Sequence, residues 1–219
     1  MGDKTRIAID GPSGAGKSTI AKRVAKLLGI DYIDTGAMYR AIGLKILQNG
    51  VGLGDNGGLK RLLAQTEIDF FDGNIILDGI IVNDRIRTPE VSKMASDCSA
   101  LPEVREKLVA LQKKMGQTKS VVMDGRDIGT NVLTDAEYKF FMTASAAERA
   151  KRRWLELNEK GETADLAQVE ADIIGRDHND STRKLNPLKK ADDAIELDTT
   201  GMTIEDVTQK ILEVVKWQS

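Results

Sequence analysis

Hydrophobic positions along the chain alternate between short continuous runs and helical stripes. Residues 6–10 are an apolar run that predicts a buried strand. From Lys17 to Leu28, apolar side chains recur at helical spacing, and Gly29 follows as a helix stop. A strand over 32–34 and a helix over about 37–48 repeat this order. Alternation of this kind predicts an α/β fold with a mostly parallel sheet and helices on both faces.

The pattern changes between residues 50 and 90. A glycine-rich turn leads to a short helix, and apolar runs follow at 68–71, 75–77 and 80–82. Asp-Gly turns separate these runs, at 72–73 and 78–79. Such turns predict antiparallel hairpins, and hence a small β subdomain inserted into the parallel fold.

After this insert the alternation resumes. We expect a helix over about 103–115, strands at 121–123, 139–142 and 194–197, and a closing helix from about Ile204 to Trp217 that buries Val207, Ile211, Val214 and Val215. The stretch between 146 and 190 is highly charged and helical in pattern. The prediction is a single domain over 1–219, with a core of about 1–36, 100–145 and 190–219, an insert of about 37–99 and a helical region of about 146–189.

Composition excludes several classes of protein. The 219 residues carry a formal net charge of −2, so an excess of basic residues cannot drive binding, and no nucleic-acid partner is expected. The single cysteine, Cys98, excludes an internal disulfide and a multi-thiolate metal site, and its small neighbours predict a buried, inert thiol. No apolar run approaches the ~18 residues that span a bilayer. We therefore expect a cytoplasmic protein without a membrane partner. A monomer is the expected state, although the sequence leaves the oligomeric state open.

Residues 11–18 read Gly-Pro-Ser-Gly-Ala-Gly-Lys-Ser, a complete G-x-x-x-x-G-K-[ST] phosphate loop between a strand and an amphipathic helix. Backbone N–H groups of such a loop point at phosphate oxygens, and the helix N-terminus adds partial positive charge. We expect Lys17 to reach the β and γ phosphates of ATP and the Ser18 hydroxyl to bind Mg²⁺. The predicted contacts to ATP are Gly11, Pro12, Ser13, Gly14, Ala15, Gly16, Lys17, Ser18 and Thr19. The motif predicts binding of a nucleoside triphosphate but leaves the reaction open.

Three kinds of nucleotide-using protein contain such a loop. A GTPase switch needs an Asn-Lys-x-Asp segment, which does not occur in the sequence. A motor or transport ATPase usually has adjacent acidic residues after a strand, whereas the strand at 121–123 ends in the single Asp124. A small-molecule kinase needs a second anion site, converging arginines and a mobile lid. Candidates for all three are present, which favours a kinase.

The candidate second anion site follows two of the predicted strands. Thr35 can cap the helix after the second strand, and Arg40 on that helix can bind a phosphate through two hydrogen bonds. Asp-Gly-Arg-Asp at 124–127 stands at the carboxyl end of an apolar strand, where open α/β sheets bind ligands. The alternative for this segment is a solvated loop held by an Arg–Asp pair.

Together these motifs resemble the bacterial cytidylate kinase family. The resemblance covers nearly the whole chain and is carried by residues 9–17, 34–40, 85–91, 123–130, Arg176-Asp177 and Arg183. It implies ATP-dependent phosphorylation of CMP and dCMP, with the inserted subdomain as the monophosphate-binding part. The alternatives are a phosphate-loop kinase for another nucleoside monophosphate or small metabolite, and a non-catalytic nucleotide sensor. Residues 176–183 contain fewer arginines than some members show, so the division of roles among them stays open.

The resemblance also implies roles for individual residues. Asp127 would accept a hydrogen bond from the cytosine amine, Arg105 would donate to the ring acceptors, and Ser96 would lie beside them, a pairing that suits the edge of this base. The alternative for Ser96 and Arg105 is a plain helix surface. The monophosphate site that the family pattern implies comprises Thr35, Arg40, Ser96, Arg105, Arg126, Asp127, Arg176, Asp180 and Arg183.

The charged helical region corresponds to the lid of such kinases. Arg149 and Arg153 are expected to reach ATP, whereas Lys151 belongs to a solvated face. No strong general base is needed, because the attacking phosphate oxygen is ionised near neutral pH, so catalysis depends on positioning and charge neutralisation. The predicted catalytic residues are Lys17, Arg126, Arg153 and Arg183. Asp34 and Asp124 are expected, from position alone, to hold water ligands of Mg²⁺, and His178 to be a polar surface residue.

Overall fold

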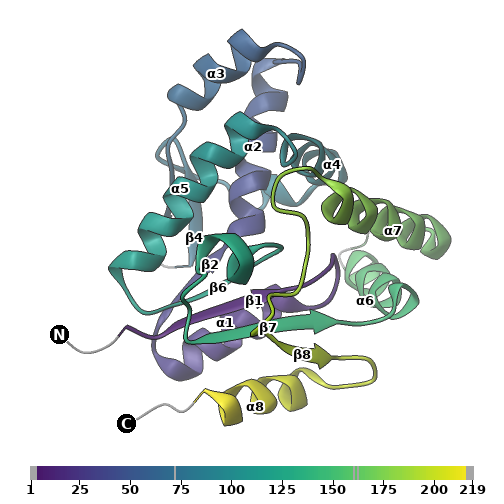
Figure 1. The fold of residues 1–219 in the computed structure, drawn as a ribbon. Coiled ribbons are helices and arrows are strands. Elements are labelled where there is room, and N and C mark those ends of the chain that lie inside the picture. Colours follow the sequence, from purple (N-terminus) through teal and green to yellow (C-terminus); the bar gives the residue numbers. More distant parts are fainter. Residues whose placement is uncertain (1–3, 72, 160, 162, 216–219) are drawn as a thin grey trace. The chain divides into compact units, whose positions relative to one another are not determined.

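The larger of the two sheets described in the computed structural model has five strands, in the order β2-β6-β1-β7-β8 (Figure 1). Its strands are β1 (Arg6–Asp10), β2 (Asp31–Asp34), β6 (Val121–Gly125), β7 (Tyr138–Thr143) and β8 (Ile195–Asp198). β1 pairs in parallel with both β6 and β7, and β7 pairs in parallel with β8. Helices flank this sheet, so the predicted α/β fold is confirmed.

The structure describes residues 4–71, 73–159, 161 and 163–215. The chain divides into two compact units, one made of residues 1–32 and 118–219 and the other of residues 33–117. The first unit contains most of the parallel sheet, and the second contains a small antiparallel sheet. The predicted boundaries of core, insert and lid stay predictions.

Helices α1 (Lys17–Leu28) and α8 (Ile204–Val214) pack together in the first unit and share a core with β1, β6 and β7. Gly29 takes the left-handed conformation that ends α1, as expected. The stripe that α1 buries includes Ile20 and Val24, but Leu27 lies at the edge of that stripe and is exposed. Val207, Ile211 and Val215 are buried and Val214 is half-buried, while Trp217 lies outside the described residues.

The charged region forms two helices, α6 (Ala146–Glu159) and α7 (Leu166–Thr182). They pack on each other through a small apolar cluster of Ala150, Leu157, Val169 and Ile173. The predicted helical character of this region is confirmed, and its role as a lid stays a prediction. Between β6 and β7 the chain makes a short wide helical turn, η2 (Ile128–Val132).

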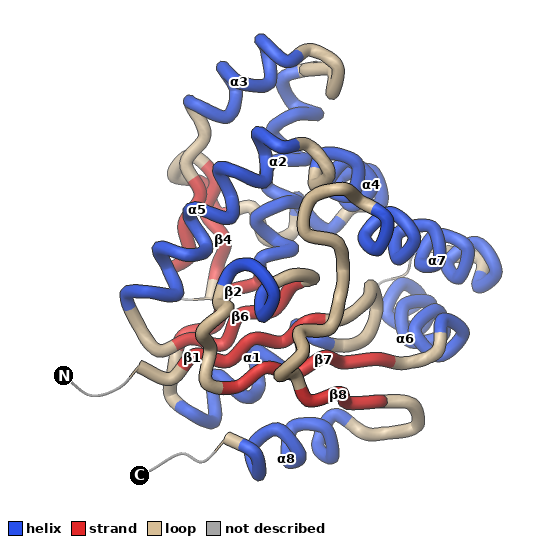
Figure 2. Tube along the Cα trace, viewed as in Figure 1, coloured by secondary structure: helices blue, strands red, loops and turns tan. Residues whose placement is uncertain are grey.

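The second unit contains the antiparallel sheet of β3 (Ile68–Phe71), β4 (Asn74–Leu77) and β5 (Ile80–Ile81) (Figure 2). Asp78 and Gly79 both have positive φ, at 50° and 80°, which is the conformation that a tight hairpin turn requires. The predicted hairpins are therefore confirmed. Its helices are α2 (Thr35–Asn49), α3 (Asn56–Ala64), η1 (Arg85–Arg87), α4 (Pro89–Cys98) and α5 (Pro102–Thr118).

Two details of the second unit differ from expectation. The N-cap of α2 is Asp34, whose carboxylate accepts from the N–H of Ala37, so the prediction that Thr35 caps this helix is wrong. Asp34 can cap because its short carboxylate reaches the third amide of the helix while its backbone stays extended. Helix α4 has no counterpart among the predicted elements, although Thr88 caps it and Pro89 stands at its first turn. Cys98 at its end is fully buried, as expected.

Candidate active site

The phosphate loop connects β1 to α1 and approaches neighbouring backbone closely. A Cβ atom on Gly11 would lie 2.1 Å from the carbonyl oxygen of Met142 in β7, so no larger residue fits there. Gly14 and Gly16 have φ of 75° and 81°, which L residues with side chains rarely adopt. The N-cap of α1 is Gly16, which has no side chain to accept from the first amides of the helix. The first amides of α1 are therefore donors suited to an anion.

Lys17 begins α1 and is almost completely buried. Its Nζ donates to the carbonyl oxygen of Pro12 in the loop, 2.7 Å away. The pKa of Lys17 is lowered to about 7, chiefly by burial and then by the charge of Arg126, against the attraction of Asp124, Asp10 and Asp180. The ammonium is thus a poorly solvated charge that gains from a nearby anion.

Asp124, at the carboxyl end of β6, joins two hydroxyl groups. The Ser18 hydroxyl donates to its Oδ2 and the Tyr32 hydroxyl donates to its Oδ1, each across 2.9 Å. Asp124 is buried, whereas Ser18 is exposed. Hydroxyl and carboxylate oxygens are ligands that Mg²⁺ prefers, so this pair fits the predicted metal-binding role. Tyr32 was not among the predicted site residues.

Four more predicted residues form one charged network beyond β6. Arg126 Nε donates to Asp180 Oδ2 at 2.7 Å, and Arg183 Nη2 donates to Asp127 Oδ1 at 3.0 Å. Arg183 Nη1 also lies 3.7 Å from Asp180 Oδ1. Burial alone would lower the pKa of Arg126, but pairing with Asp180 outweighs this and raises it. The chain thus brings the predicted residues of the 124–127 segment and of the end of α7 together.

Three other predicted residues lie on the two charged helices. Arg149 is buried and contacts the phosphate loop through a hydrogen bond from Nη1 to the carbonyl oxygen of Ser13. Arg153 Nη1 pairs with Glu156 on its own helix at 3.0 Å. Arg176 is half-buried on α7, and His178 on the same helix is exposed, as expected for a polar surface residue.

Asp10 is a further buried carboxylate that was not predicted for the site. It ends β1, directly before the loop, and accepts hydrogen bonds from the N–H groups of Ile128 at 2.8 Å and Gly129 at 2.7 Å. Burial raises the pKa of Asp10 to about 6, although both amides oppose this shift. A charged residue closing an apolar strand immediately before a phosphate loop was the signal that could have identified it.

The second unit holds the remaining predicted residues. Arg40 Nη2 lies 3.1 Å from Asp34 Oδ2, so Asp34 both caps α2 and orients an arginine on its first turns. Arg105 is buried, and its Nη1 donates to the Tyr39 hydroxyl at 3.2 Å. Thr35 is buried at the start of α2, and Ser96 is half-buried on α4. Arg105 is therefore not the plain helix surface that was the alternative to a binding role.

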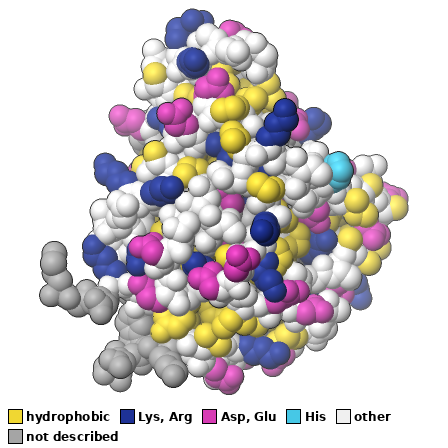
Figure 3. Space-filling view, viewed as in Figure 1, with side chains coloured by type: hydrophobic (Ala, Val, Ile, Leu, Met, Phe, Trp, Pro, Cys, Tyr) yellow, Lys and Arg dark blue, Asp and Glu magenta, His cyan; other side chains and the backbone are white. Residues whose placement is uncertain are grey.

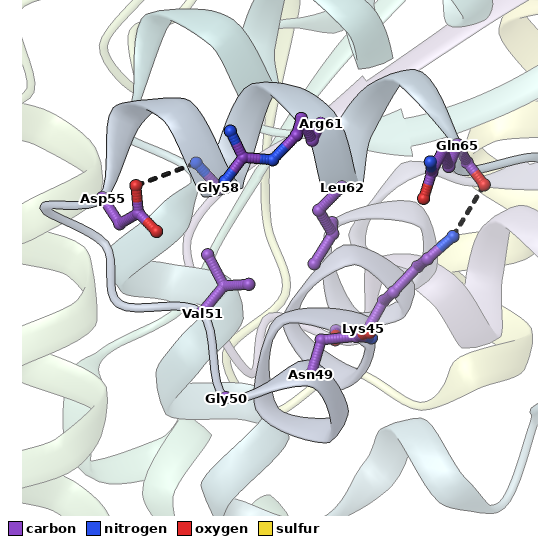
Figure 4. Close-up of a pocket in the computed structure, with 9 residues that line it drawn as sticks. All are labelled: Lys45, Asn49, Gly50, Val51, Asp55, Gly58, Arg61, Leu62 and Gln65. Atoms are coloured by element: carbon purple, nitrogen blue, oxygen red, sulfur yellow. Dashed lines mark hydrogen bonds between the residues drawn. The ribbon is translucent and has the colours of Figure 1, made fainter.

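A separate pocket of about 330 Å³ lies in the second unit between α2 and α3 (Figure 4). It contains no predicted site residue. Its polar groups serve the fold: Lys45 donates to the carbonyl oxygen of Gln65 and pairs with Asp78, and Asp55 caps α3. We therefore take the phosphate loop, and not this pocket, as the candidate active site.

Basic and acidic side chains are interspersed over the face seen in Figure 3, without a single-sign patch there. Within the described part of the chain, no helix has the length and apolar character needed to cross a membrane.

Comparison with known proteins identifies the family. The family model described as cytidylate kinase matches residues 7–217. The chain belongs to the cytidylate kinase family. A cytidylate kinase from Caldicellulosiruptor bescii is 53% identical over 215 residues, which cover 96% of this chain and 95% of that protein. One from Alkaliphilus oremlandii is 51% identical, covering 96% of this chain and 97% of that protein. The chain is therefore an enzyme of the kinase class, and these relatives support ATP-dependent phosphorylation of CMP.

Solved structures agree on the fold of this cytidylate kinase family member. An uncharacterised protein from Eubacterium ventriosum aligns with a TM-score of 0.55 at 14% identity, covering 97% of this chain and 98% of that one. A shikimate kinase from Bacteroides thetaiotaomicron aligns with a TM-score of 0.50 at 12% identity, covering 97% and 99%. These similarities support a kinase-type phosphate-loop fold.

Proposed function

We propose that the chain transfers the γ-phosphoryl group of ATP to a phosphate oxygen of CMP or dCMP, giving ADP and the cytidine diphosphate. The observation that carries the proposal is the complete phosphate loop, with Lys17 and Ser18 opening α1, in a member of the cytidylate kinase family. Backbone N–H groups of residues 14–18 are proposed to hold the ATP phosphates, aided by the N-terminus of α1.

Catalysis is proposed to proceed by charge neutralisation. The attacking oxygen of the monophosphate is already ionised near neutral pH, so the transfer needs no strong base. Lys17 is poised to gain from phosphate charge, because burial has lowered its pKa and an anion restores its ammonium form. Arg126, Arg183 and Arg153 are the further groups proposed to neutralise charge in the transition state.

Ser18 and Asp124 are the residues proposed to hold Mg²⁺, Ser18 directly and Asp124 through water. Their oxygens already lie 2.9 Å apart, and Asp124 is oriented by Tyr32. When bound, the ion would neutralise charge on the β and γ phosphates. Asp34 remains a weaker candidate, because its carboxylate is engaged by Ala37 and Arg40.

Cytosine recognition is the proposed role of Asp127, together with Arg105 and Ser96 of the second unit. A carboxylate accepts from the exocyclic amine of cytosine, whereas uracil would present an acceptor to the same oxygen. Arg40, Arg126 and Arg183 are proposed to bind the monophosphate. Thr35, Arg176 and Asp180 are the remaining residues of the proposed monophosphate site.

The proposal is tested by measuring ADP production from ATP and Mg²⁺ with CMP, dCMP, UMP, AMP, GMP and dTMP in parallel. Strong preference for CMP and dCMP is the expected result. If another monophosphate is preferred, the kinase stands and the assignment of the base site is wrong. If none reacts, the proposed reaction is wrong and the chain uses ATP in another way.

A further inference from the structure

Asp177 joins helix α7 to the phosphate loop. Its Oδ1 accepts a hydrogen bond from the backbone N–H of Ser13 at 3.0 Å, and its Oδ2 accepts one from Nη1 of Arg149 at 2.6 Å. The same Nη1 donates to the carbonyl oxygen of Ser13 at 2.7 Å. Carboxylate, guanidinium and loop residue therefore form a closed ring of hydrogen bonds.

This ring of hydrogen bonds is largely shielded from solvent, and a further hydrogen bond holds Arg149 in place. The side chains of Arg149 and Asp177 are only 7% and 20% exposed, and Arg149 Nε is held by the carbonyl oxygen of Ala144. The next loop residue, Gly14, touches the same two helices: a Cβ there would lie 3.2 Å from Cβ of Arg149 and 3.4 Å from Cδ1 of Ile173. Helices α6 and α7 thus both pack closely against the loop at Gly14. Charge-assisted hydrogen bonds in such surroundings are stronger than those between neutral groups.

We propose that Asp177 is a positioning residue for the triphosphate of the nucleotide. It anchors the start of the loop through the Ser13 amide and fixes the Arg149 guanidinium against the loop, so that the following loop amides and Arg149 are in place when the phosphates bind. The inference rests on the proposed function, because the phosphate loop and Arg149 are proposed contacts of ATP. Asp177 acts through these two groups, and its own negative charge is offset by Arg149.

The decisive variant is Asp177→Asn. The amide oxygen still accepts from Ser13, but the amide nitrogen is a donor and cannot accept from Arg149, so the ion pair is lost. We expect the KM for ATP to rise about tenfold, the loss typical of one charged hydrogen bond, with an unchanged KM for CMP. The dissociation constant of a non-hydrolysable ATP analogue, measured by calorimetry, should rise by the same factor. Asp172→Asn is the matched control, since Asp172 is exposed on the same helix and accepts a hydrogen bond from Gln168 of that helix.

An equal rise in both KM values would overturn the proposal, because it would indicate a general loss of structure. Unchanged or tighter ATP binding in a normally folded variant would also overturn it, the latter by showing that the carboxylate competes with phosphate for the loop. If Asp177→Asn does not fold, Asp177→Glu provides the second test: it keeps the charge but moves the carboxylate by one methylene from the position that reaches both Ser13 and Arg149, and must show the same selective loss of ATP binding.

Wild-type turnover of CMP in the same assay distinguishes a failure of the proposed function from a failure of the proposed role of Asp177. An inactive wild type would refute the proposed function, while the analogue-binding comparison would still test Asp177. An active wild type with unaltered ATP binding in Asp177→Asn would refute only the role of Asp177.

Discussion

Arg183 and Asp127 form a buried ion pair, with 3.0 Å between Nη2 and Oδ1 and exposures of 5% and 7% for the two side chains. Arg183 follows α7, Asp127 follows β6, and Asn131 donates to the other carboxylate oxygen. The residue proposed to read cytosine is therefore held by one proposed to bind its phosphate. Any change at Asp127 should affect both stability and substrate preference.

Removal of that carboxylate is the first prediction. Asp127→Ala should lower the free energy of unfolding by about 3 kcal/mol, the lower end for a broken buried pair, because Arg183 still has Asp180 at 3.7 Å. Urea denaturation measures the loss. Asp127→Asn retains an acceptor for Arg183 and should lose less stability, while both variants should lose the preference for CMP over UMP. Wild-type stability in both variants would contradict the importance of the ion pair.

Lys17 should be essential for turnover but not for folding. Lys17→Met keeps the apolar stem and removes a poorly solvated charge, so the melting temperature should be unchanged or raised. We expect kcat to fall about 10³-fold, as when a key donor to transition-state charge is removed. Lys22→Met, at an exposed position on the same helix, is the control and should have normal kcat. Near-normal turnover of the Lys17 variant would refute the assignment of the phosphate site.

The requirement for Mg²⁺ should depend on Asp124. Asp124→Asn should raise the Mg²⁺ concentration for half-maximal activity about 10–100-fold, the usual effect of losing an outer-shell partner of a metal. Tyr32→Phe removes one hydrogen bond to the same carboxylate and should give a smaller shift in the same direction. Titration of MgCl2 at fixed ATP measures both. A larger effect of the Tyr32 change than of the Asp124 change would show that Tyr32 acts in another way.

Asp10 should make stability depend on pH. Its pKa is raised from 3.8 to about 6, so between these values the folded protein retains a proton that the unfolded chain has lost. The contribution is fully present below pH ~3.8, decreases as pH rises, and is lost above pH ~6, a change of about 3 kcal/mol. The Asp10→Asn variant should lack this pH-dependent contribution to the free energy of unfolding. The check is the difference in unfolding free energy between wild type and variant from pH 4 to 7; a difference that does not fall with pH would contradict it.

Cys98 should be inert in the native protein. Burial raises the pKa of its thiol to about 12, and the side chain has no exposed surface. A maleimide should therefore label it only after unfolding, or during rare local opening at the end of α4. Native labelling as fast as that of a free thiol would show that this end of the helix opens readily.

Much of the fold was predictable because its signals are local. The apolar runs of β1 and β6, the helical stripe of α1 and the Asp-Gly turn at Asp78 each lie within a short segment. The prediction of a helix cap was wrong where two neighbouring residues could both perform the same role. Asp34 rather than Thr35 caps α2, since two adjacent residues can both cap a helix and the local pattern cannot choose between them.

The phosphate loop could also be recognised from the sequence alone, since its glycines, Lys17 and Ser18 lie within eight consecutive residues and the loop conformation is local. The pairing of charged side chains could not be predicted from the sequence. Arg126 with Asp180, Arg183 with Asp127, and Arg149 with Asp177 join segments 54, 56 and 28 residues apart. Each of these carboxylates has near it in sequence an arginine other than the partner named here, Arg126 for Asp127 and Arg176 for Asp177 and Asp180. The packing of α6 and α7 against the loop and the end of β6 selects the partner instead. Ion pairs need atoms within about 4 Å, and no periodicity along the chain specifies a distance across the fold.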